Sequence, residues 1–84
     1  KRINRIAMSA RYEETMALAN STALADLATR TKLAINQNAI LSPEEKRTAL
    51  GWLLEVLRDS NASESDKRAA LADYILSGQR TAMR

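Results

Sequence analysis

Residues that form turns are scarce in this chain, which holds only two Gly and one Pro among 84 residues. None of the three lies within residues 1–41. An all-β domain needs many turns, and Gly and Pro supply them. The chain has 15 Ala and a single Val, and Ala favours helices whereas β-branched residues favour strands. The sequence therefore predicts an all-α fold, and a chain this short is expected to form a single small domain over residues 1–84.

Two Ser-headed segments give the clearest signals for helix starts. Ser42-Pro43-Glu44-Glu45 combines an N-cap hydroxyl, Pro at the first helical position and Glu at the third, which is a capping box. It predicts a middle helix over residues 42–59. Ser63-Glu64-Ser65-Asp66 resembles a second N-cap and predicts a third helix over residues 63–78, with Gly78 as its left-handed C-terminal residue. These two helices should form a hairpin.

An Ala-rich apolar stripe with a seven-residue step runs through the first 41 residues. It predicts one long N-terminal helix, of the kind found in a coiled coil, packed on the hairpin as a three-helix bundle. The run Asn20-Ser21-Thr22 has poor helix propensity, so the helix either passes through it, or kinks or breaks near residues 20–22. Continuity is the favoured alternative. The stripe is imperfect and consists of Ile3, Ala10, Ala17, Leu24, Thr31 and Asn38, with the companion series Ile6, Glu13, Asn20, Leu27 and Ala34 and the adjacent Ala7, Ala28 and Ile35.

Seven of the nine residues from Ala49 to Leu57 are apolar. A surface helix usually has one apolar stripe, so a helix that is apolar around most of its circumference should be covered on two sides. Trp52, the only Trp, is then expected to anchor the core. The alternative is that Trp52 forms part of an interface, where Trp is enriched.

The predicted helices differ in length. A helix of about 37 residues would be about 55 Å long, whereas a 17-residue partner would span about 25 Å. The amino end of the long helix would therefore extend beyond the core, and an exposed apolar face usually marks an interface. The residues of this predicted interface are Ile3, Ile6, Met8, Tyr12 and Met16.

Charge is distributed unevenly, although the net charge is only +3. Residues 13–76 hold seven bases and ten acids, whereas both ends are basic and lack acids. A cluster of bases can contact nucleic-acid phosphates, and a short basic amphipathic helix can lie on an anionic membrane. We regard the membrane as the less favoured of the two. The candidate phosphate contacts are Lys1, Arg2, Arg5 and Arg11.

The segment Asp26–Leu33 resembles the first helix and turn of the helix-turn-helix motif of DNA-binding proteins. The resemblance covers about 20 residues and then departs from the motif. Lys32 stands where Gly is usual, the recognition helix would bury Asn38, and it would expose Ile35. The amides from Asn36 to Asn38 could in principle read adenine edges, but such a run is more often solvated.

Residues suited to catalysis or metal binding are few, because the chain has no His and no Cys. His is the commonest general base and metal ligand. The neighbouring acids Glu13-Glu14 and Glu44-Glu45 point in different directions on a helix and do not form a dyad. We therefore predict no enzyme activity, no cofactor and no metal.

These observations predict a non-enzymatic helical module that binds protein, including copies of itself, through its N-terminal helix. The alternative is a small basic helical protein that binds nucleic acid or belongs to a nucleoprotein. A third alternative is a helical domain excised from a larger enzyme, since the chain does not begin with Met. The sequence does not fix the location of the protein, although we favour the cytoplasm.

Overall fold

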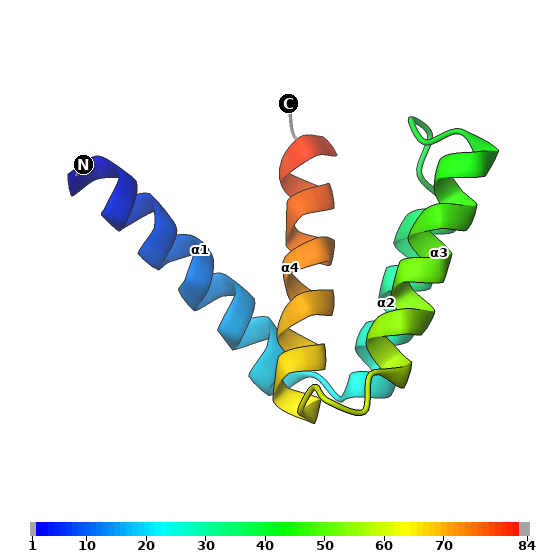
Figure 1. The fold of residues 1–84 in the computed structure, drawn as a ribbon. Helices are drawn as coiled ribbons and strands as arrows, with labels where there is room; N and C mark the ends of the chain where they lie inside the picture. Colours follow the sequence, from blue (N-terminus) through cyan, green and yellow to red (C-terminus); the bar gives the residue numbers. More distant parts are fainter. Residues whose placement is uncertain (1, 83–84) are drawn as a thin grey trace.

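The computed structural model describes the backbone of residues 2–82 and the side chains of residues 12–78. This part of the chain is all-helical and contains no β-strand, which confirms the predicted fold class. Figure 1 shows its elements, which are α1 (Arg2–Ser21), α2 (Leu24–Asn36), α3 (Pro43–Arg58) and α4 (Glu64–Ala82).

The prediction of one long N-terminal helix in a three-helix bundle is wrong, because the chain breaks between α1 and α2. Ala23, which precedes α2, has extended backbone angles of φ −63° and ψ 150°. At the end of α1 the Ser21 hydroxyl donates to the carbonyl of Leu18 at 3.3 Å, a local bond that competes with continued helix. The break also serves packing. Ala19 and Leu27, on either side of it, belong to one core, whereas a straight helix would separate them by about 12 Å along its axis.

The helix with the most neighbours is α4, which contacts the other three helices, α1 and α2 more extensively than α3. In Figure 1, α1 lies on one side of α4, and α2 and α3 lie on the other. Both the α1–α2 and the α3–α4 connections lie at the same end of the molecule, which we call the base. The amino end of α1, the carboxyl end of α4 and the α2–α3 loop lie at the other end, which we call the open end.

All four helices contribute to the hydrophobic core. Its buried members are Ala19, Leu27, Leu53, Leu71, Ala72 and Ile75. Half of them come from α4, so α4, and not the middle helix, occupies the centre. In α3 only Leu53 is buried, while its neighbour Leu54 is 50% exposed. The expectation that the middle helix is covered on two sides agrees with its contacts to α2 and to α4, but the cover is partial, because Leu54 faces solvent.

The predicted apolar stripe agrees with burial along α2 except at Ala34, which is exposed, and it is wrong along α1. In α2, Leu27, Thr31 and Ile35 are fully buried at steps of four residues, and the Thr31 hydroxyl donates to the carbonyl of Leu27 at 2.8 Å. In the part of α1 with described side chains, residues 12–21, the buried residues are Thr15 and Ala19, whereas the predicted Ala17 is exposed. The break between the helices resets the helical phase, so a stripe counted through it fails on one side.

The starts of α3 and α4 agree with the sequence signals, and the end of α4 does not. Ser42 forms a complete capping box with Glu45, and the Ser63 hydroxyl accepts a bond from the backbone N–H of Asp66 at 3.0 Å. Gly78 was expected to end the third helix in a left-handed conformation. Instead α4 continues to Ala82, and no described glycine has a positive φ.

Among the helices that the structure describes, none combines the length and the apolar character needed to cross a bilayer.

Candidate interaction surfaces

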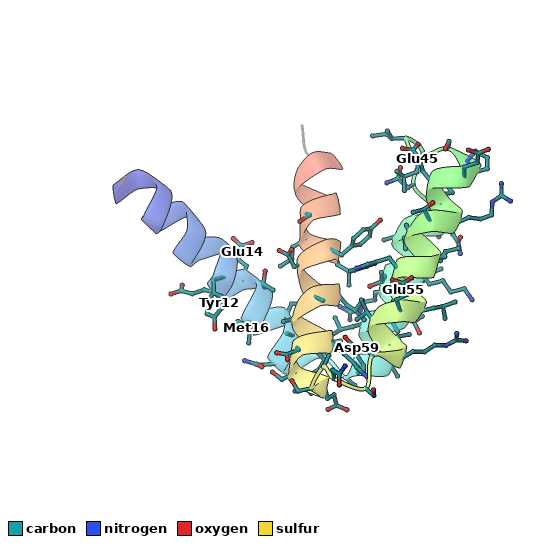
Figure 2. The ribbon with its side chains drawn as sticks, in the orientation of Figure 1. Tyr12, Glu14, Met16, Glu45, Glu55 and Asp59 are labelled. Atoms are coloured by element: carbon teal, nitrogen blue, oxygen red, sulfur yellow. The ribbon has the colours of Figure 1, made fainter. Side chains whose placement is uncertain are left out.

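The first candidate surface is the amino half of α1. Within residues 12–21, the part of α1 whose side chains are described, the buried residues are Thr15 and Ala19, and Figure 1 shows the backbone of the helix diverging from α4 toward its amino end. Tyr12 is 66% exposed. Figure 2 shows Tyr12 and Met16 on the side of α1 away from α4, whereas Glu14 points into the space between the two helices.

The structure therefore locates two of the five predicted interface residues, the exposed Tyr12 and the half-buried Met16. The other three lie outside the residues whose side chains are described, and so do all four candidate phosphate contacts. They are Ile3, Ile6 and Met8, and Lys1, Arg2, Arg5 and Arg11. Because the long helix is broken, the difference in length between the predicted helices no longer indicates an interface. The divergence of α1 from α4 now supports it instead.

The second candidate surface is a groove of about 570 Å³ at the open end, bounded by the α2–α3 loop, α3 and α4. Its lining is largely apolar, with an acidic edge. The apolar part consists of Leu41, Ala49, Trp52 and Tyr74, and the polar edge consists of Ser42, Glu44, Glu45 and Thr48.

The apolar floor of the groove is built by an aromatic pair. The ring centroids of Trp52 and Tyr74 lie 5.2 Å apart with an interplanar angle of 32°, a separation typical of favourable aromatic pairs. Trp52 is half-buried and packs on the edge of the core. Trp52 therefore packs on the core without being one of its buried members, and it also lines the groove, whereas its part in an interface stays a prediction.

The acidic edge is held in place by the capping box. The backbone N–H of Ser42 donates to Glu45 Oε1 at 2.9 Å, and the backbone N–H of Glu45 donates to the Ser42 hydroxyl at 3.1 Å. The bond from the Ser42 backbone, with a smaller contribution from its side chain, lowers the pKa of the Glu45 carboxyl below its usual range. Glu45 is therefore anionic at neutral pH, and Figure 2 shows it at the open end of α3.

The α2–α3 loop beside the groove presents an exposed apolar side chain. Asn38 Oδ1 accepts the backbone N–H groups of Ile40 at 2.7 Å and Leu41 at 2.9 Å. These two bonds fix the turn, and they leave Ile40 80% exposed next to the groove-lining Leu41. Asn38, considered above as a possible reader of adenine, thus has a structural role in this loop.

The helix-turn-helix resemblance is not supported by the fold. Asp26–Leu33 lies within the continuous helix α2 and contains no turn. Two lysines of the described chain are also engaged in the fold. Lys46 Nζ donates to the carbonyl of Asn36 and Lys67 Nζ to that of Leu57, each at 3.0 Å. These lysines bind helix ends, and they are not arranged as a surface for phosphates.

Among the described residues, no group of three or more acidic side chains could hold a metal ion. Glu44 and Glu45 line the groove, but Glu45 is occupied by the capping box. No protein-family model, curated protein or solved structure matches this chain.

Sequence reasoning missed the groove. Its apolar walls come from three separate segments, represented by Leu41, Trp52 and Tyr74, and nothing in a linear pattern joins them. One available signal was the pair Ile40-Leu41, two large apolar residues in a segment that also carries the start of a capping box. Large apolar residues in such a loop indicate either a buried loop or a contact surface.

Proposed function

We propose that this chain is a non-enzymatic helical module for protein–protein interaction and assembly, which associates with copies of itself through the amino end of α1. The observation that carries the proposal is the divergence of α1 from α4 together with the 66% exposure of Tyr12. A helix that leaves its own core presents an unpaired face, and burial of such a face requires a partner.

The experiment is a determination of mass in solution over a range of protein concentrations. We expect mass to increase with concentration, and Tyr12→Glu to shift this increase to higher concentration. Leu33→Glu is the matched control, because Leu33 is also a half-exposed apolar residue but lies on α2. A wild-type chain that stays monomeric at every concentration would exclude self-association.

The second candidate is nucleic-acid binding by the basic amino end, and the four bases without an acid in residues 1–12 favour it. The same mass measurement, repeated with DNA and with RNA at low and high salt, separates the two proposals. Binding whose affinity falls steeply with salt would support nucleic-acid contact. An assembly that forms equally well in high salt and leaves nucleic acid unbound would support the protein-interaction module.

A further inference from the structure

The groove at the open end combines two recognition properties. Trp52 and Tyr74 provide an apolar floor, and Glu44 and Glu45 provide an acidic edge without a base among the lining residues. A segment that fits such a groove carries apolar side chains flanked by positive charges, because complementary charges fix register and raise the rate of association.

The amino end of this chain has that composition. Within residues 1–11 it carries Ile3 and Ile6, one helical turn apart, together with four bases and no acid. The bases are Lys1, Arg2, Arg5 and Arg11. Residues 1–12 carry more net positive charge than residues 13–76 or residues 77–84. The amino end is therefore the part of the chain whose charge best complements the acidic edge of the groove.

The two surfaces of one molecule face apart. The helix α1 leaves the bundle on the side of α4 opposite to α3 (Figure 1), whereas the groove lies between α4 and the start of α3. The packing of Thr15 and Ala19 fixes the root of α1 in this direction. Thus the amino end can enter a groove without unpacking α1 only if that groove belongs to another molecule.

We propose that the amino-terminal segment of one copy, residues 1–11, docks in the Trp52–Tyr74 groove of a second copy, with its bases against the acidic edge at Glu44. This inference rests on the proposed function and names the receptor surface for it. Each chain then has one donor segment and one acceptor groove, so the contact joins two different surfaces.

The first test is charge reversal at the groove. Glu44→Lys places a positive charge on the edge, and we expect the dissociation constant of self-association to rise by at least about tenfold. Glu55→Lys is the matched control, because Glu55 is an exposed acid on α3 that does not line the groove, and a change below about twofold is expected. Thr48→Arg is a second groove variant outside the first turn of α3, in case Glu44→Lys disturbs the helix start.

The decisive test mixes two variants that each associate poorly alone. Arg5→Glu places one acid in the donor segment and leaves the groove intact, and Glu44→Lys places one base on the groove edge and leaves the donor segment intact. In the mixture the introduced acid can pair with the introduced base, and the unchanged donor meets an unchanged groove, so we expect sedimentation to show association restored to within about threefold of wild type. Circular dichroism checks that each variant is folded.

The outcomes separate the two proposals. If wild type associates, but Glu44→Lys and Glu55→Lys have equal effects, or the mixture is not restored, the groove is not the receptor, whereas self-association stands. If wild type does not associate at any concentration, both proposals are excluded.

Discussion

Lys46 and Lys67 occupy equivalent positions at two successive helix junctions. Each follows the N-cap serine of its helix by four residues, and each ammonium reaches back ten residues to a carbonyl in the last turn of the preceding helix. The two segments share the pattern Ser-x-x-acid-Lys, as Ser42 to Lys46 and Ser63 to Lys67. The serine binds the new helix start, and the lysine binds the carbonyl end of the helix before it, where the helix dipole favours a cation.

Removal of either lysine ammonium should therefore destabilise the junction between its two helices. We expect Lys67→Met to lower the free energy of unfolding by about 1 kcal/mol, because this lysine is partly buried and loses a charged hydrogen bond. The hydrogen bond of Lys46 is exposed, so the same change at Lys46 should lower the free energy of unfolding by about half as much. Urea unfolding measures both. Lys32→Met, on an exposed residue of α2, is the control, and a loss there as large as at Lys67 would contradict this role.

The capping box predicts a dependence of stability on pH. Because the pKa of Glu45 is lower in the folded chain than in the unfolded chain, its contribution is present above the unfolded pKa. It is lost as the pH falls through the folded pKa. Wild type should therefore lose stability below about pH 4.5 relative to Glu45→Gln, which keeps an acceptor but does not titrate. Thermal melts at several pH values measure this difference, and parallel profiles for the two proteins would be the contrary result.

The neighbouring leucines of α3 should respond very differently to truncation. Leu53 is 5% exposed in the core, and Leu53→Ala should cost about 2–5 kcal/mol. Leu54 is 50% exposed, and Leu54→Ala should cost less than about 1 kcal/mol. Chemical denaturation of the two variants measures both losses in the free energy of unfolding. Equal losses would mean that Leu54 is covered as fully as Leu53, which contradicts its exposure.

A glycine inside α3 offers a stabilising substitution. A Cβ placed at Gly51 meets no atom within 4 Å, and its backbone is helical. We expect Gly51→Ala to raise the free energy of unfolding by about 0.5–1 kcal/mol, because Ala loses less conformational entropy than Gly in a helix. Gly78→Ala in α4 should act in the same direction, since it too has open space. A measured loss at Gly51 would indicate a partner that packs on this face.

The sequence predicted those features that depend on neighbouring residues. The start of α3 at Pro43 was readable because a capping box is complete within four residues. The buried stripe of α2, from Leu27 to Ile35, was readable because one helix keeps one phase. In both places local chemistry and packing favour the same structure.

Features decided by packing between segments were not predictable in this way. The run Asn20-Ser21-Thr22 permits either a helix or a break, and the core that joins Ala19 to Leu27 favours the break. Likewise, the apolar residues of α3 do not reveal that Leu54 faces solvent while Trp52 lines a groove. Such outcomes depend on where α4 lies.

The placement of two of the three interhelical connections at the base has a consequence for motion. Ala19, Leu27, Leu53 and Leu71 bring all four helices together in the core, while the amino end of α1 and the α2–α3 loop lie at the open end. Backbone amides around the core should then exchange with solvent deuterium only on global unfolding. Those near Tyr12 and Ile40 should exchange through local opening. We therefore expect the region around the core to stay folded while the amino end of α1 and the α2–α3 loop open locally.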